Sequence, residues 1–311
     1  MMPRTVLCVA AVLLVSALAG ATTAGCGRAG DDASTGALRV ATTATFLADI
    51  AQNVAGDRFT VTALVPSDAD LHAFEPTPRD VATVNSSDLF ILNGGGLEGP
   101  LEDALRAAAP ETVFVTASQG LAPRRPQPGE PLREGGDDPH FWLDPTLTVT
   151  YVENIRDAFS AADPGGEAAY RANAAAYITR LRALDTWIEA RVRRLPARDR
   201  LLVMNHLSHG YFADRYGFRI VGAVVPSVAG DESPTAKQLT GLAGAIRSQG
   251  VRAVFVELGE NARLARQIAA ETGIRVVTGL RTHSLSGPDG EAPTYIDMMR
   301  YDTRLIVGGL E

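Results

Sequence analysis

The chain has 311 residues, of which 46% are hydrophobic and 21% are charged, and its formal net charge is −7. This length allows two compact domains of about 100–150 residues each. The composition is that of a globular protein and is too polar overall for a protein with several membrane spans. The acidic balance argues against nucleic acid as a partner.

The first 25 residues read as an export signal. Arg4 gives a basic start, and an unbroken apolar or small stretch follows from Val6 to Ala24. We interpret Thr-Ala-Gly-Cys (23–26) as a bacterial lipobox with Thr in place of the usual first Leu, so that Cys26 becomes the acylated N-terminus. The alternative is a plain secretory signal that is cleaved nearby. We therefore expect an extracytoplasmic protein that is lipid-anchored to the bacterial cell membrane through Cys26.

Cysteine usage narrows the chemistry. The chain has only two cysteines, Cys8 inside the signal and Cys26 at the anchor. The mature protein therefore has no disulfide, and catalytic cysteines and thiolate metal sites are excluded.

Short β-branched runs alternate with helical stretches in two sets of four, which is the rhythm of parallel βαβ units. The predicted strands are 38–43, 59–65, 88–93 and 112–116 in the first set, and 200–205, 219–225, 252–257 and 274–278 in the second. We predict an α/β fold in which a flexible tether (26–37) precedes two lobes of about four strands each. The N-terminal lobe covers residues 38–162 and the C-terminal lobe residues 197–311.

A continuous helical pattern, residues 163–196, lies between the two lobes. Asp163 and Pro164 provide an N-cap and a first-turn proline, and Pro196 ends the pattern. A helix of about 30 residues is about 45 Å long, enough to run along both lobes as a rigid connector. The alternative is a surface helix inside one domain. Its apolar positions, which step by four and three, are Tyr170, Ala174, Tyr177, Leu181, Leu184, Ile188, Val192 and Leu195.

Histidines are few, and their positions are informative. Four of the five stand at or beyond the predicted carboxyl ends of strands, or in the loops that follow, two in each half of the chain: His72, His140, His206 and His283. In open α/β sheets this edge is where ligands bind. A single loop histidine is usually only solvated, but four at corresponding places indicate one site between lobes that face each other.

Two motifs carry a resemblance to a known family, HAFEPTP (72–78) and DPHFWLDP (138–145). With the segments around His206 and His283, they are similar to the zinc- and manganese-binding lipoproteins of ABC importers, the ZnuA/TroA/AztC type, over essentially the whole mature chain. The resemblance implies two (β/α)4-like lobes joined by one long rigid helix, with a single metal ion in the inter-lobe cleft. It also implies a monomeric receptor that performs no reaction and delivers its metal to a cognate ABC permease in the membrane.

The resemblance also implies the ligands. The first three match His72, His140 and His206, and the fourth is usually an aspartate just before a serine in the final loop, where this sequence has His283. The fallback ligands are Asp231, Glu257 and His209, of which His209 stands where relatives usually have a residue that is not a ligand.

An all-nitrogen ligand set favours Zn²⁺, whereas manganese favours carboxylate and water. An Mn²⁺-binding receptor or adhesin of the same fold is therefore an alternative. Glu75 and Asp144 are candidates for accepting a hydrogen bond from the ring N–H of a histidine whose other nitrogen binds the metal. Capping of turns is their other possible role. The sequence leaves open whether a zinc chaperone loads the site.

A secreted zinc-dependent hydrolase is the competing function, because three histidines and a water can form a catalytic zinc site. Such an enzyme needs an open coordination position and a general base. No H-E-x-x-H motif occurs, and four histidines would fill the coordination shell. We therefore expect a binding protein and not an enzyme.

Two loops need an interpretation. Residues 94–99 fit G-x-G-x-x-G after a strand, but Glu98 would face the pyrophosphate of a dinucleotide, so we predict a tight turn into a helix that begins at Pro100. Residues 118–139 contain five prolines and four glycines without apolar periodicity. We expect this loop to overhang His140, with Glu130 among its weak metal collectors.

Overall fold

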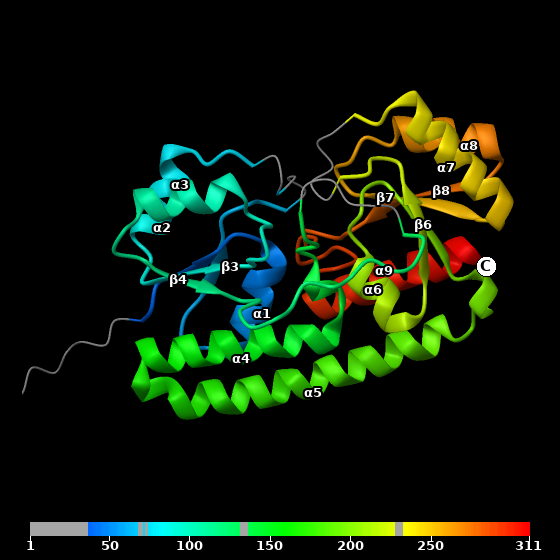
Figure 1. Ribbon diagram of the computed structural model, residues 1–311. Coiled ribbons are helices and arrows are strands. Elements are labelled where there is room, and N and C mark those ends of the chain that lie inside the picture. Colours follow the sequence, from blue (N-terminus) through cyan, green and yellow to red (C-terminus); the bar gives the residue numbers. More distant parts are fainter. Residues whose placement is uncertain (1–36, 68–70, 72–73, 131–135, 228–232) are drawn as a thin grey trace, which may run out of the picture. The chain divides into compact units, whose positions relative to one another are not determined.

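The computed structural model describes residues 37–67, 71, 74–130, 136–227 and 233–311 (Figure 1). They belong to one compact unit, Ala37–Glu311. Three residues for which the sequence predicts a role, Cys26, His72 and Asp231, lie outside the described residues.

The first lobe is built on a parallel sheet with the strand order β2-β1-β3-β4. Its strands are β1 (Val40–Thr42), β2 (Val61–Ala63), β3 (Leu89–Leu92) and β4 (Val113–Thr116). Val40 pairs with Val61 on one side and with Leu89 on the other, so β1 is a central strand. The helices between these strands are α1 (Thr45–Ala55), α2 (Pro78–Asn85) and α3 (Pro100–Ala108), and α3 begins at the predicted proline.

The second lobe repeats this arrangement with the strand order β6-β5-β7-β8, again all parallel. Its strands are β5 (Leu201–Met204), β6 (Arg219–Ala223), β7 (Ala253–Glu257) and β8 (Arg275–Leu280). Its helices are α6 (Gly210–Tyr216), α7 (Ala236–Gln249), α8 (Arg263–Thr272) and α9 (Tyr295–Leu310). All eight predicted strands are present, and the predicted α/β fold of two four-stranded lobes is confirmed.

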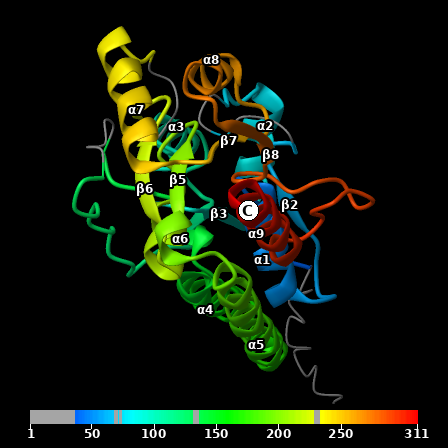
Figure 2. The same ribbon diagram turned by 90° about the vertical axis from the view of Figure 1, so that its right-hand side faces the viewer.

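Two long helices, α4 (Pro145–Ala162) and α5 (Glu167–Val192), run side by side along the lobes (Figures 1 and 2). Helix α5 contacts α1 of the first lobe and both α6 and α9 of the second. Its buried side chains are Tyr170, Ala174, Tyr177, Leu181, Leu184, Ile188 and Val192, which are seven of the eight positions that the apolar pattern predicts. The eighth, Leu195, is also buried but lies beyond the end of the helix. The connector helix therefore buries one continuous apolar stripe against both lobes.

The start of this helix differs from the prediction. A short 3₁₀ turn, Pro164–Gly166, separates Asp163 from α5, and Gly166 occupies the N-cap position. The carboxylate of Asp163 does not cap α5, because it accepts hydrogen bonds from the guanidinium of Arg58 and the hydroxyl of Tyr170. A β-carbon on Gly166 would lie 2.6 Å from the carboxylate of Asp163, so glycine leaves room for these hydrogen bonds.

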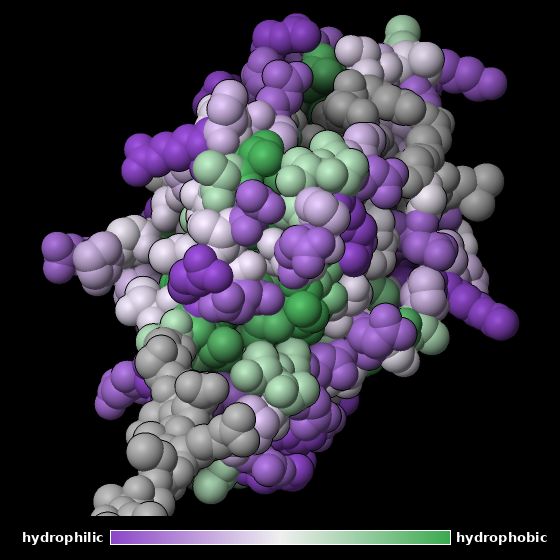
Figure 3. Space-filling model, turned by 90° about the vertical axis from the view of Figure 1, so that its left-hand side faces the viewer, coloured by the Kyte–Doolittle hydropathy of each residue, from purple (hydrophilic) through white to green (hydrophobic). Residues whose placement is uncertain are grey.

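Apolar side chains are buried in both sheets. Every residue of β3 and of β5 is buried, as expected for parallel strands covered on both faces. Among the large apolar side chains of the described residues, only Val113 and Leu258 are exposed. The face shown in Figure 3 is mostly hydrophilic, with apolar side chains gathered near its middle. In the described part of the chain, no helix combines the length and the apolar character needed to cross a bilayer.

Candidate metal centre

The strand order of each sheet creates a switch point at its carboxyl edge. In the second sheet β5 and β7 are neighbours in the centre. The chain runs from β5 outward to β6 on one side and from β7 outward to β8 on the other, so the two connections diverge. Ligands of open α/β sheets bind in the crevice at such points. His206 lies two residues beyond β5, and Glu257 is the last residue of β7. The topology therefore places an imidazole and a carboxylate at the switch point.

His140 is fixed by the turn that precedes it. The side chain of Asp138 accepts the backbone N–H of His140 at 3.1 Å, and the same oxygen lies 2.8 Å from Nδ1 of the imidazole. This Asx-type turn brings the ring back over its own backbone. With Nδ1 donating its proton to Asp138, Nε2 carries the lone pair that can bind a metal ion.

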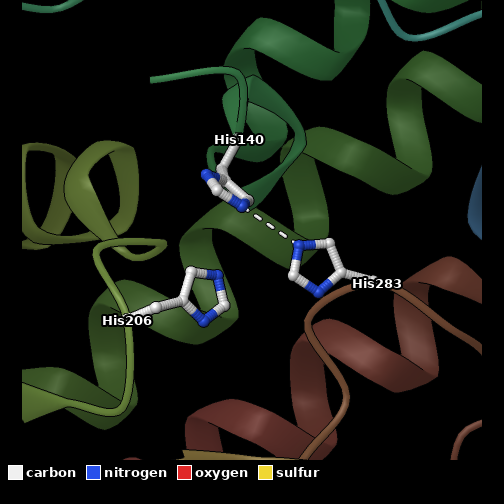
Figure 4. Close-up of side chains that lie close together, drawn as sticks. All are labelled: His140, His206 and His283. Atoms are coloured by element: carbon white, nitrogen blue, oxygen red, sulfur yellow. Dashed lines mark hydrogen bonds between the residues drawn. The ribbon is translucent and has the colours of Figure 1, made fainter. Parts of the chain in front are cut away.

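Three imidazoles converge on one point. The side chains of His140 and His206 are fully buried, and that of His283 is half-buried. The Nε2 atoms of His140 and His283 lie 3.0 Å apart (Figure 4). One ligand nitrogen from each of the three residues lies within 4.8 Å of the other two. His140 comes from the segment before α4, whereas His206 and His283 come from the second lobe.

These distances suit a small divalent cation. Four nitrogens at about 2.0–2.1 Å from a tetrahedral ion lie about 3.3 Å from one another, so the described atoms need to move by only about 1 Å. Two buried carboxylates add negative charge, because Asp138 contacts His140 and an oxygen of Glu257 lies 3.5 Å from Nδ1 of His206. Three neutral imidazoles backed by two carboxylates can hold a dication away from water.

Glu257 belongs to a buried polar group at the end of β7. Burial alone would raise the pKa of Glu257, but His206, His209 and the hydroxyl of Ser208 hold it at about 2. The Ser208 hydroxyl donates to Glu257 at 2.6 Å and lies 2.8 Å from Nδ1 of His209. Burial lowers the pKa of His209 to about 4. Glu257 is therefore ionised and His209 neutral at pH 7.

The other predicted site residues are placed differently. His209 lies outside the group of three described nitrogens and stands at the N-cap position of α6. Asp144 caps α4 by accepting from the backbone N–H and the hydroxyl of Thr146. Glu75 is exposed, and its neighbour His72 lies outside the described residues. Capping thus occupies Asp144, and the carboxylate that contacts His140 is that of Asp138.

The contact between Asp138 and the imidazole of His140 was not predicted from the sequence. The signal was present as Asp-Pro-His, since an aspartate two residues before a histidine can form an Asx turn onto that residue. Glu130 was expected to collect metal, but its side chain is completely buried and paired with Arg124 at 2.7 Å. Arg124 also binds Asp214 of α6, so this part of the loop is fixed to the second lobe.

The glycine-rich loop holds its own carboxylate. Glu98 is buried and accepts hydrogen bonds from the backbone N–H groups of Asn93 and Gly94 and from the hydroxyl of Thr43. A β-carbon on Gly95, whose φ is 65°, would lie 2.8 Å from the ring of Phe141. The loop therefore uses these N–H groups internally and packs against the segment of His140, which agrees with the prediction of a tight turn.

Known proteins share this fold and sequence pattern. The family model of the zinc-uptake complex component A, periplasmic (ZnuA), matches residues 40–309. The chain is 33% identical over 308 residues to the manganese-binding lipoprotein MntA of Halalkalibacterium halodurans, covering 97% of this chain and 98% of that protein. It is 33% identical over 276 residues to the iron-binding protein YfeA of Yersinia pestis, covering 88% and 86% of the two chains.

A solved structure supports the fold. The periplasmic zinc binding protein TroA of Treponema pallidum matches with a TM-score of 0.81 at 24% identity, covering 88% of this chain and 99% of that chain. The resemblance inferred from the two sequence motifs is confirmed. Because the family model extends from the first strand to the last helix, this chain belongs to the family of the periplasmic zinc-uptake complex component A.

Proposed function

We propose that this protein captures one divalent metal ion between its lobes and delivers it to an ABC permease in the membrane. The observation that carries the proposal is the convergence of His140, His206 and His283 from distant parts of the chain. In this proposal the three imidazoles are ligands and His72 is the fourth. The metal is the cargo of the protein and takes part in no reaction.

Zinc is the proposed cargo. Nitrogen ligands suit Zn²⁺, which accepts tetrahedral coordination without an electronic preference for another geometry. The two related proteins are named for manganese and iron, metals that accept more oxygen ligands. An Mn²⁺ receptor is therefore the second candidate, and the all-histidine set of this chain is the argument for zinc.

Extracytoplasmic location and lipid anchoring at Cys26 are part of the proposal. They are supported by the signal-like first 25 residues and by a relative that is named a lipoprotein. A secreted zinc hydrolase is the less favoured function, because the relatives carry the names of binding proteins and the site has four candidate ligands.

The test is elemental analysis of protein purified without added metal, followed by competition between zinc and manganese for the metal-free protein. We expect one zinc per chain and tighter binding of zinc than of manganese. The variants His140→Ala and His206→Ala should each lose most of the affinity. Unchanged zinc binding in both variants would show that the metal binds elsewhere, and stronger binding of manganese would favour the second candidate.

A further inference from the structure

We infer that Trp142 and Thr45 of the first lobe hold the backbone on both sides of His283, and that this bracket sets the metal affinity of the site. The bracket is defined by two hydrogen bonds, from Trp142 to Thr282 and from Leu285 to Thr45. The inference rests on the proposed metal-binding function and adds two positioning residues that contribute no ligand atom.

The first bond of the bracket comes from an immobile side chain. The indole N–H of Trp142 donates to the carbonyl of Thr282, the residue before His283, at 2.9 Å. Trp142 is completely buried, and its ring stacks on Phe46 with centroids 4.4 Å apart. The hydroxyl of Tyr295 donates to the carbonyl of Trp142 at 2.5 Å. The indole is therefore fixed by the core of the protein.

The same indole contacts two of the proposed ligands. Its centroid lies 5.1 Å from that of His140 and 5.7 Å from that of His283. The plane of the His140 ring is inclined to the indole by 50° and that of the His283 ring by 64°, so one aromatic surface limits the rotation of both imidazoles. Trp142 thus restrains the relative orientation of two imidazoles that come from different lobes.

The second bond lies on the other side of His283. The hydroxyl oxygen of Thr45 accepts the backbone N–H of Leu285 at 2.9 Å. Thr45 is the first residue of α1, close to the carboxyl end of β1. The backbone is therefore tied to the first lobe one residue before His283 and two residues after it.

This restraint matters because His283 lies in a long loop between β8 and α9. An unrestrained loop would have to be ordered when the metal binds, and that entropy cost would lower the affinity. A neutral imidazole also attracts a cation less strongly than a carboxylate does. The metal affinity therefore depends more on where the imidazole of His283 is held. Loosening the bracket should therefore weaken binding although every ligand remains present.

The experiment measures zinc affinity of the full-length protein by competition with a chromophoric chelator for Trp142→Phe, Thr45→Val and the control Thr112→Val. Trp142→Phe should weaken binding about 10- to 100-fold, as outer partners of metal ligands do. Thr45→Val removes one hydrogen-bond acceptor and should weaken binding about 2- to 10-fold. Thr112 also makes a buried hydroxyl hydrogen bond, to the carbonyl of Val84. It lies at the amino end of β4, whereas the site lies beyond the carboxyl ends of the strands, so its variant should bind zinc like the parent.

The visible spectrum of bound Co²⁺ provides a second readout, since it reports the ligands around the ion, which a loss of stability alone leaves unchanged. We expect an altered spectrum for Trp142→Phe and Thr45→Val and the parent spectrum for Thr112→Val. Parent affinity and parent spectrum in Thr45→Val would overturn the bracket, and this variant decides the matter if Trp142→Phe does not fold. If His140→Ala and His283→Ala lose zinc but Thr45→Val binds it like the parent, the inference about the bracket is wrong and the proposed function stands. Parent binding in both histidine variants would overturn the proposed function.

Discussion

The Nε2 atoms of His140 and His283 lie 3.0 Å apart although 143 positions separate the two residues in the chain. Without a metal, this contact is a hydrogen bond in which one of the two nitrogens carries the proton. A metal ion needs the lone pairs of both nitrogens, so this proton would have to move to the other nitrogen of its ring. In acid, protonated imidazoles would have to lose a proton before they could bind metal, so metal binding should weaken as the pH falls.

Asp138→Asn should weaken zinc binding about 10- to 100-fold. The variant keeps an oxygen that can accept from His140, but it loses the negative charge that makes the imidazole a stronger ligand and offsets the charge of the metal. Competition titration with zinc is the measurement. Asp137→Asn is the matched control, because Asp137 is the exposed neighbour of the buried Asp138. Equal affinity of the two variants would contradict the role of Asp138.

Arg124→Gln should destabilise the protein by about 3 kcal/mol, because it removes the positive charge that faces the buried carboxylate of Glu130. The side chains of Arg124 and Glu130 are 4% and 0% exposed. The free energy of unfolding from urea titrations is the measurement. The control is Arg171→Gln, which breaks an exposed pair with Glu167 on α5 and should cost about 0.5 kcal/mol or less. Similar losses in both variants would argue against a fixed loop.

Much of the fold was predictable because its signals are local. Each strand appears as a short β-branched run, and the buried stripe of α5 follows directly from its apolar spacing. Helix α4 was not predicted, although Asp144 and Pro145 form a cap and first-turn signal at its start. Its first half contains Thr and Val residues, whose branched side chains lower helix propensity and obscure the pattern.

The site was predictable only in part. The positions of His140, His206 and His283 beyond strand ends pointed to a shared site, because parallel strands present their carboxyl ends at one edge. The partners of these imidazoles could not be chosen in this way. Asp138 and Asp144 flank His140 in a similar sequence context, and only the backbone turn shows that Asp138 contacts the ring while Asp144 caps a helix.

Asp302→Asn should change how stability depends on pH. Burial raises the pKa of Asp302 to about 8, above its usual value of 3.8. Between these values the folded protein retains a proton that the unfolded chain releases, so this group makes the parent less stable as the pH rises, by up to about 1.4 kcal/mol per unit. This loss of stability is complete by about pH 8, where the folded protein releases the proton as well. Asparagine does not titrate, so urea unfolding of the metal-free proteins should show the parent falling relative to the variant between pH 5 and 8. Parallel stability profiles would refute the prediction.

Cys26→Ser should release the protein from the membrane. The apolar segment that ends at Gly25 and Cys26 motivates this expectation, since serine cannot accept the thioether-linked lipid. Fractionation of cells into membrane and soluble extracytoplasmic fractions is the measurement. Cys8→Ser is the control, because Cys8 lies inside the signal and should not affect anchoring. Membrane retention of the Cys26 variant would place the anchor elsewhere.

His283→Asp should preserve zinc binding and shift the preference toward manganese by on the order of tenfold. Zinc accepts oxygen as well as nitrogen, whereas manganese gains more from a carboxylate. The substitution also adds a negative charge to a site in which Asp138 and Glu257 already lie near imidazoles. Since Trp142 and Thr45 hold the backbone on both sides of residue 283, the shorter carboxylate would occupy the same side of the site.

His283→Ala is the companion variant, and it should weaken zinc binding because water has to fill the vacant position. Competition titrations with zinc and manganese on both variants separate the two roles that His283 can have. A ligand predicts weaker zinc binding with alanine and altered selectivity with aspartate. A residue that only lines the site predicts parent affinity with alanine and parent selectivity with aspartate. That second pair of results would reduce the described ligands to His140 and His206, and Glu257, which lies near His206, would be the first candidate to replace His283 beside His72.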